Sequence, residues 1–329
     1  MPDQSSGDGA SNANSYTHSA EPAPAPNPNL EDLELMMNWY HLDIHNTLST
    51  NSECKSVWQD ALRRESLSHP FLMHGILALS ALNLACRSGG YSLNVYQRPY
   101  ITVALSHHSQ AVALFQPFLE NIDEHNSKAI FLHSILLTVF AFGSPEPQAS
   151  MTICRSIDQF HLVLLLSRGM QQAFCTATDW IDDNEFKTII KPDDYTPCLP
   201  DDAKAALRKL RQINESCEQY TVCNEKNAYS ASIDQVQFTL EQIHGGARRP
   251  NPAVTWAVKV PPLYLELMRA YKPMALVVLA YYCVILHHLR EIWWVSGWSV
   301  PLLRAIWSSL DDEWRKPLRW VLEVTGFAP

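Results

Sequence analysis

The longest uncharged hydrophobic run in the chain covers residues 274–286. A bilayer takes about 17–25 apolar residues, so a run of thirteen predicts a buried core helix and no membrane span. Pro273 fits the first turn of this helix, where its missing N–H costs nothing. A dense aromatic group of Trp293, Trp294 and Trp298 follows. We therefore expect a central helix that ends in a tryptophan-rich turn.

Apolar residues recur every three to four positions through much of the remaining chain, which predicts further helices. The predicted helices cover residues 30–44, 57–67, 69–86, 100–122, 128–142, 151–166, 258–269 and 299–324, with more polar, surface-facing helices at 201–222 and 230–244. Gly169 is expected to end the helix at 151–166, and residues 179–200 and 245–252 read as loops. Because no alternating strand pattern of useful length occurs, the predicted class is all-α.

The domain organisation follows from composition. Residues 1–29 are rich in Ser, Asn, Ala and Pro and hold almost no large apolar side chains, which predicts a disordered tail. Residues 30–329 contain no interior Gly/Ser linker, and we expect one large helical domain there.

Charge and cysteine spacing exclude several functions. The formal net charge is −9 and basic doublets such as Arg63-Arg64 and Arg248-Arg249 are few, so we expect no direct nucleic-acid binding by this chain. The eight cysteines contain no CxxC pair, which argues against structural zinc. No signal peptide pattern opens the sequence, and the expected location is the nucleus, the cytoplasm or both.

Motifs for catalysis or metal binding are weak. His41 and His45 have a spacing that suits two metal ligands, but no third ligand or HExxH glutamate accompanies them, and we expect no metal. No GxSxG, Walker or GxGxxG pattern supports a hydrolase, kinase or dehydrogenase, and no cofactor is expected. Acidic doublets such as Asp182-Asp183 do not face each other on a helix, which makes them poor acid/base pairs.

Five helix-core stretches together resemble the regulatory domain of fungal zinc-cluster transcription factors, in the branch of the sterol uptake control proteins. They are LELMMNWYHLDIHNTLS (34–50), HPFLMHGILALSALNLA (69–85), SKAIFLHSILLTVFAF (127–142), VPPLYLELM (260–268) and KPMALVVLAYYCVIL…WWVSGW (272–298). The resemblance implies an all-helical domain with a hydrophobic pocket for a lipid such as a sterol, and often a dimer. The family binds DNA through a separate cluster of six cysteines. Here the first cysteine is Cys54, inside the matching region, so that module is expected to be absent.

Two functions remain open. One is a non-catalytic regulator that binds a sterol, terpenoid or polyketide and acts through a homodimer or a transcription-factor partner. The other is a cofactor-free cyclase, isomerase or Diels–Alderase that reuses the pocket by orienting a reactive metabolite. The candidate pocket residues for either are His74, His108, Tyr271, Tyr281, His287, Trp293, Trp294 and Trp298.

Overall fold

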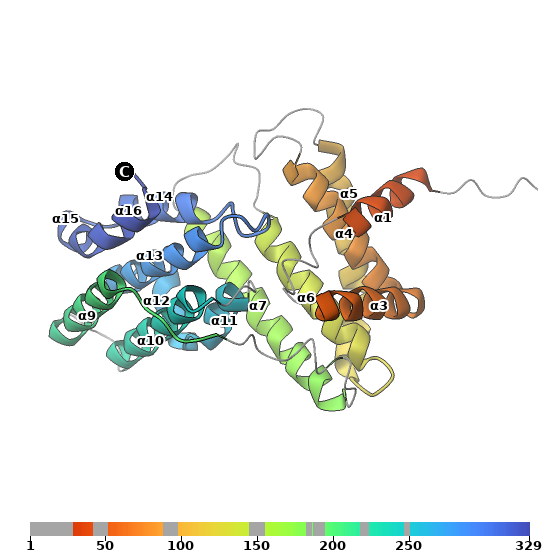
Figure 1. Ribbon diagram of the computed structural model, residues 1–329, viewed down its shortest axis with the longest axis horizontal. Helices are drawn as coiled ribbons and strands as arrows, with labels where there is room; N and C mark the ends of the chain where they lie inside the picture. Colours follow the sequence, from red (N-terminus) through yellow and green to blue (C-terminus); the bar gives the residue numbers. More distant parts are fainter. Residues whose placement is uncertain are drawn as a thin grey trace, which may run out of the picture.

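The computed structural model describes residues 29–41, 52–87, 98–144, 155–181, 186, 195–217, 224–246 and 251–329. Within these ranges every regular element is a helix, which confirms the all-α class (Figure 1). The first half comprises α1 (Leu30–His41), α3 (Ser52–Ser68), α4 (Pro70–Arg87), α5 (Arg98–Phe115), the 3-10 helix η1 (Gln116–Glu120), α6 (Ser127–Gly143) and α7 (Arg155–Trp180). The second half comprises α9 (Asp201–Ser216), α10 (Glu225–His244), α11 (Asn251–Lys259), α12 (Pro262–Arg269), α13 (Pro273–His288), α14 (Ser299–Ser309), α15 (Asp312–Arg315), the 3-10 helix η3 (Lys316–Leu318) and α16 (Arg319–Thr325). Residues 1–28 of the tail predicted at 1–29, and the Leu42–Ile44 continuation of the first helix, lie outside the described residues.

Two groups of helices are joined by the pair α6 and α7 (Figure 1). On one side, α4 packs against α1, α3, α5 and α6. On the other side, α7 packs against α6 and also against α11, α12 and α14. The Arg168 guanidinium of α7 donates from Nη1 to the carbonyl oxygens of Val258 (3.1 Å) and Val260 (2.6 Å), where α11 ends. This arginine therefore satisfies carbonyls that the end of a helix leaves without an intrahelical partner.

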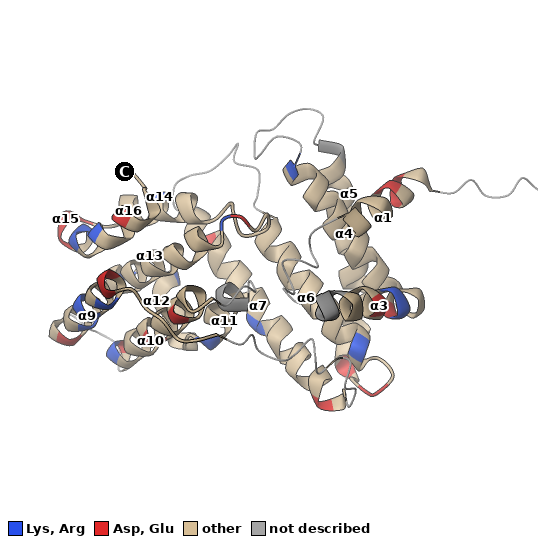
Figure 2. Ribbon diagram, viewed as in Figure 1, with Lys and Arg blue, Asp and Glu red and all other residues tan. Residues whose placement is uncertain are grey.

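The helix at the centre of the second group is α13, as the sequence predicts. Residues 274–286 are all buried, and α13 contains no Asp, Glu, Lys or Arg. Pro273 occupies its first turn. Charged side chains lie instead on outer helices such as α3, α9 and α15 (Figure 2). A helix that is apolar on every side is stable only when neighbours cover all of it, and α10, α14 and α16 contribute to that cover.

By length and composition alone, α4 is long and apolar enough to cross a membrane. Within its 18-residue apolar window, 67% is buried inside the protein. Burial of this kind is what the core helix of a globular fold shows.

The prediction that Gly169 ends its helix is wrong. The helix α7 continues to Trp180, because Ala173 and Ala177 extend its buried stripe beyond the glycine. A Cβ placed on Gly169 would meet no atom within 4 Å, so this glycine lies on an open face. The tertiary packing of the helix outweighs the roughly 1 kcal/mol that glycine costs in a helix interior.

Several predicted boundaries also differ. The predicted helix at 100–122 is divided into α5 and η1, with Pro117 in the first turn of η1. The predicted helix at 299–324 is divided into α14, α15, η3 and α16, and Pro317 lies in η3. Proline removes a backbone donor and clashes with the preceding turn, which explains the break at Pro117 and the short 3-10 helix at Pro317. The separation of α14 from α15 lies earlier, at Leu310, whose extended backbone ends α14. Asn251, in the predicted loop at 245–252, already begins α11.

Candidate functional site

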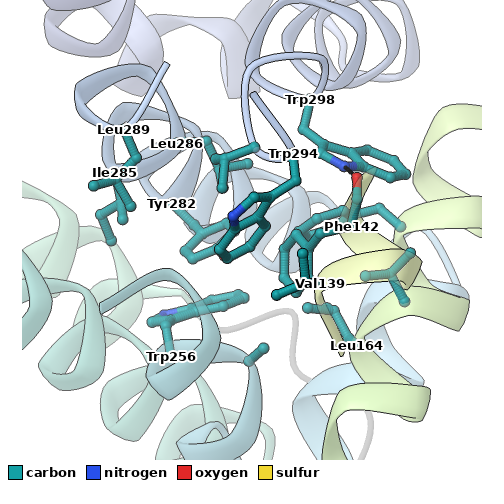
Figure 3. Packing of buried hydrophobic residues seen from close by; sticks show 14 of the residues in the cluster. Val139, Phe142, Leu164, Trp256, Tyr282, Ile285, Leu286, Leu289, Trp294 and Trp298 are labelled. Carbon is teal, nitrogen blue, oxygen red and sulfur yellow. Dashed lines mark hydrogen bonds between the residues drawn. The ribbon is translucent and has the colours of Figure 1, made fainter. Parts of the chain in front are cut away.

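The tryptophan-rich turn follows α13 and leads into α14. Its backbone closes on itself, because the amide of Val295 donates to Ile292 O and the amide of Trp298 donates to Val295 O. This fold directs Trp294 and Trp298 inward, at 2% and 4% exposure. Two of the three indoles of the turn, those of Trp294 and Trp298, are therefore buried in the protein interior (Figure 3).

Phe142, near the end of α6, contacts both buried indoles. The Nε1 of Trp298 donates to Phe142 O over 2.7 Å. The ring of Trp294 meets the Phe142 ring edge-on, with centroids 5.6 Å apart (Figure 3). Beside it, a Cβ on Gly143 would lie 3.1 Å from the Trp293 ring and 3.2 Å from Trp294 Cβ. Glycine is therefore the residue that lets the turn approach α6 this closely.

The two indoles belong to a longer chain of aromatic rings. Trp256 of α11 stacks on Tyr282 of α13 at 4.0 Å, and Tyr282 lies 5.7 Å from Phe160 of α7. Phe160 in turn lies 5.0 Å from Trp298 and 6.1 Å from Phe142. Offset and edge-on pairs at these separations add stabilisation beyond the area they bury. The chain of rings connects α6, α7, α11, α13 and the turn.

Three buried polar atoms near or within this region have no hydrogen-bond partner among the described residues. They are the Nε1 donors of Trp293 and Trp294 and the Oδ1 acceptor of Asn83. Leaving such a group unpaired costs about 1–3 kcal/mol. The indole N–H of Trp298 differs from these two, because it is paired with the Phe142 carbonyl of α6. Two of the three indole donors of the turn are thus buried without an acceptor among the described residues.

The structure places the three predicted tryptophans together and the predicted tyrosines apart from them. Tyr281 faces α9 and η3, and its hydroxyl donates to the carbonyls of Ala206 (3.4 Å) and Pro317 (3.2 Å). Burial raises its pKa. Tyr271 lies in the α12–α13 connection with a φ of 54°, and its hydroxyl donates to Asp158 over 2.8 Å. Both tyrosine hydroxyls thus hydrogen-bond to residues of other helices.

The predicted histidines also lie in separate places. His287 is half-buried at the C-terminal end of α13, beside His288. The ring centroid of His288 lies 5.0 Å from that of His244. Burial, with a smaller effect of Arg290, lowers the pKa of His287. His108 of α5 stacks flat on Phe140 of α6 with centroids 3.9 Å apart.

His74 belongs to the first group of helices. Its Nδ1 lies 2.9 Å from the Nδ1 of His107 on α5. Burial and the nearby His107 lower the pKa of His74. The hydrogen bonds and ring contacts described above join His74, Tyr271, Tyr281 and His287 to residues outside the tryptophan-rich turn.

Some residues of this region were not anticipated from the sequence. Phe142, Phe160 and Asn83 are ordinary core residues by pattern, and only the folded chain brings them to the turn or beside α6. Gly143 did carry a signal, since a glycine closes the predicted helix at 128–142. Among the described residues, no three His, Cys, Asp or Glu side chains are grouped to hold a metal ion. His45, half of the weak His41/His45 pair, lies outside the described residues.

Comparison with known proteins gives two matches. Residues 34–166 match the family described as the fungal specific transcription factor domain. Over 316 residues the chain is 20% identical to a Zn(2)-C6 fungal-type transcription factor of Gibberella zeae. That alignment covers 89% of this chain and 61% of the relative, so the chain spans less than two thirds of the relative's length. The family match runs from α1 into α7 and supports a role in the regulation of transcription.

Proposed function

We propose that this chain is a fungal regulator of transcription whose helical domain binds an apolar metabolite at the tryptophan-rich turn. The match of residues 34–166 to the fungal specific transcription factor domain is the observation that supports the regulatory role. The metabolite is a sterol, a terpenoid or a polyketide, and the regulated genes belong to sterol or secondary metabolism. The regulator works in the nucleus through a homodimer or a transcription-factor partner.

The ligand-binding part of the proposal is supported by Trp294. Its side chain is 2% exposed, and its indole N–H meets no acceptor among the described residues. Binding sites for small molecules combine mainly aromatic and aliphatic walls with a few placed polar groups. The apolar neighbours around Trp294 are Phe142, Leu82 and the backbone at Gly143, and the polar groups are the indole donors of Trp293 and Trp294. An apolar ligand with one carbonyl, ether or hydroxyl oxygen matches this set.

Contact with DNA is assigned to a partner. The chain carries a net charge of −9, whereas a domain that holds nucleic acid by itself concentrates basic residues on one face. In Figure 2 the visible Lys and Arg residues are interspersed with Asp and Glu on the outer helices. The signal is therefore proposed to pass through protein contacts.

A reporter assay tests the regulatory role. The whole chain is fused to an unrelated DNA-binding module, and expression of a reporter gene is followed in a fungal host. We expect the fusion to change reporter expression, and Trp294→Phe to reduce that change. Trp320→Phe is the matched control, because its indole N–H is bonded to Asp202 at the α9–α16 contact. A folded fusion protein that leaves expression unchanged would contradict the proposal.

Incubation with an extract of the source fungus separates the regulator from the enzyme alternative. The purified chain is recovered and its bound small molecules are identified by mass spectrometry. Retention of an unchanged apolar metabolite is the expected result. A metabolite that is consumed and replaced by an isomer would instead assign a cofactor-free enzyme.

A further inference from the structure

The helix α1 carries large apolar side chains on two opposite sides. Its inner side, where Leu35 and Trp39 are buried at 0% and 3% exposure, packs on α4. A surface helix ordinarily has polar and charged residues on its other side. On α1 that side instead carries four exposed apolar residues, which we call the outer stripe: Leu30 (73%), Leu33 (48%), Met37 (66%) and Tyr40 (57%). The outer stripe lies at the edge of the molecule, where α1 is drawn in Figure 1.

The spacing of the outer stripe places its four side chains in one line. Residues 30, 33, 37 and 40 are separated by three, four and three positions, and a helix brings such positions onto one face. Exposed apolar residues scattered singly over a surface are ordinary and need no partner. A line that alternates steps of three and four is instead the pattern by which one helix packs along another. The outer stripe therefore indicates a contact with a second helix.

Polar bonds hold α1 in place and so present the outer stripe on a fixed support. Asn38 Nδ2 donates to Ser80 Oγ of α4 over 2.9 Å, and Ser80 Oγ donates to the Leu35 carbonyl over 2.6 Å. From α5, the Tyr100 hydroxyl donates to Glu34 over 2.9 Å. A surface that is already ordered loses less conformational entropy when a partner binds. These bonds on the inner side and flank leave the outer stripe itself exposed.

Charge on α1 indicates which helix fits the outer stripe. The helix contains Glu31, Asp32 and Glu34 but no Lys or Arg, and Figure 2 shows acidic residues near its beginning. The midpoint of the stripe is residue 35, so an antiparallel pair of α1 helices from two copies would bring the two Glu34 side chains together. A parallel pair would place the acidic first turns side by side. Both arrangements oppose like charges, whereas Lys or Arg on a different helix would meet opposite charge.

We propose that the outer stripe of α1 binds a protein partner through an amphipathic helix that carries Lys or Arg beside its own apolar stripe. The inference rests on the proposed action through a protein partner, and it assigns that contact to α1. Apolar side chains of the partner helix pack between Leu33 and Met37, and its basic side chains face Glu34. The tryptophan-rich turn takes no part in the contact.

Two synthetic helical peptides test the proposed contact. They share one length and one leucine stripe, and the positions beside the stripe are Lys in one peptide and Glu in the other. Fluorescence anisotropy of each labelled peptide follows its binding to the whole chain. We expect the Lys peptide to bind about tenfold or more tightly than the Glu peptide at about 0.1 M salt, and the difference to shrink toward 1 M salt, where charges are screened. Equal binding of both peptides, or no binding of the Lys peptide, overturns the proposal.

Matched variants locate the contact. The double variant Leu33→Gln/Met37→Gln should lower the affinity for the Lys peptide by about tenfold or more, because the apolar anchors are lost. Its thermal denaturation should match that of the wild type, since both side chains are exposed. The control is Leu162→Gln/Leu165→Gln, which changes two exposed leucines of α7 and should leave the affinity unchanged. An equal loss of affinity in the control would show nonspecific binding and overturn the proposal.

A charge variant tests the choice of partner. Glu34→Gln removes the negative charge but keeps an oxygen that accepts from the Tyr100 hydroxyl. It should weaken binding of the Lys peptide and leave the Glu peptide no weaker. An unchanged preference for Lys would contradict the role of Glu34. Analytical ultracentrifugation covers the other occupant: a dimer that Leu33→Gln/Met37→Gln abolishes would assign the outer stripe to a second copy and overturn the proposal.

The peptide assay also separates this contact from the proposed function. It contains no metabolite and no reporter gene, and Trp294→Phe should bind the Lys peptide as the wild type does. An inactive reporter fusion together with stripe-dependent peptide binding would refute the regulatory role alone. An active fusion whose chain binds no Lys peptide would refute the contact at α1 alone.

Discussion

The indole N–H of Trp298 donates to the backbone carbonyl of Phe142 over 2.7 Å, between residues 156 positions apart. This bond holds the tryptophan-rich turn against the end of α6. Replacing Trp298 by Phe removes the donor and leaves the Phe142 carbonyl unpaired, whereas Trp294→Phe removes a donor that has no partner among the described residues. We therefore predict that Trp298→Phe lowers the free energy of unfolding by about 1–3 kcal/mol more than Trp294→Phe does.

Chemical denaturation of the two variants and the wild type measures this difference. Both substitutions remove a similar ring volume, so each variant controls for the packing loss of the other. Equal losses of unfolding free energy would show that the Trp298–Phe142 bond contributes nothing net.

Gly143 is predicted to tolerate no side chain without a shift of the turn. A Cβ there lies 3.1–3.2 Å from the Trp293 ring, Leu82 Cδ2 and Trp294 Cβ. Gly143→Ala should reduce stability by about 1–3 kcal/mol through overpacking. Gly169→Ala is the control, because its Cβ meets nothing and alanine favours the helix; it should leave stability unchanged or raise it. Thermal denaturation compares the two, and a Gly143→Ala protein as stable as wild type would contradict the close approach.

Arg168 is predicted to fix α11 on α7. Its Nη1 donates to two carbonyls, at Val258 and Val260, and a lysine presents a point charge in place of the planar fork. Arg168→Lys should lower unfolding free energy by about 1 kcal/mol and Arg168→Ala by about 1.5–3 kcal/mol. Hydrogen exchange at the amides of residues 258–260 should rise in both variants. Unchanged exchange there would show that α11 is held by its apolar contacts alone.

The acid stability of the whole domain should depend on His133. This α6 side chain is fully buried against Phe71 and Phe115, and both of its ring nitrogens lack a partner among the described residues. Burial, followed by His108, lowers its pKa to about 3. Because the unfolded state binds the proton more tightly, stability is complete above pH 6.5 and falls by up to about 1.4 kcal/mol per pH unit between 6.5 and 3.

Substitution of His133 by Leu isolates this contribution. The variant removes the titrating ring and its unpaired nitrogens, so its unfolding free energy should vary less with pH than that of the wild type. Denaturation at pH 7, 6, 5 and 4 measures both curves. Parallel curves would assign the acid sensitivity to other histidines, such as His288, whose pKa burial lowers to about 4.

The sequence predicted the central helix because residues 274–286 carry no charge and need cover on every side. For the same reason it could not predict which neighbour each residue meets. On a helix that is buried all round, Tyr281 and Tyr282 look alike, yet Tyr281 faces α9 and η3 while Tyr282 stacks on Trp256. Contacts such as Trp298–Phe142 depend on how distant helices pack, which local periodicity does not encode. Residue chemistry alone groups the histidines with the tryptophans, whereas His74 contacts His107 and His108 stacks on Phe140.

The indole N–H of Trp294 is proposed to bind an acceptor on an apolar ligand. The most direct measurement compares two probes of one shape by tryptophan fluorescence titration: the sterol ketone cholest-4-en-3-one and the hydrocarbon cholestane. We predict that wild type prefers the ketone by about tenfold, which corresponds to one hydrogen bond of about 1.4 kcal/mol, and that Trp294→Phe abolishes this preference. Equal affinities of the wild type for both probes, or saturable binding of neither, would contradict the account.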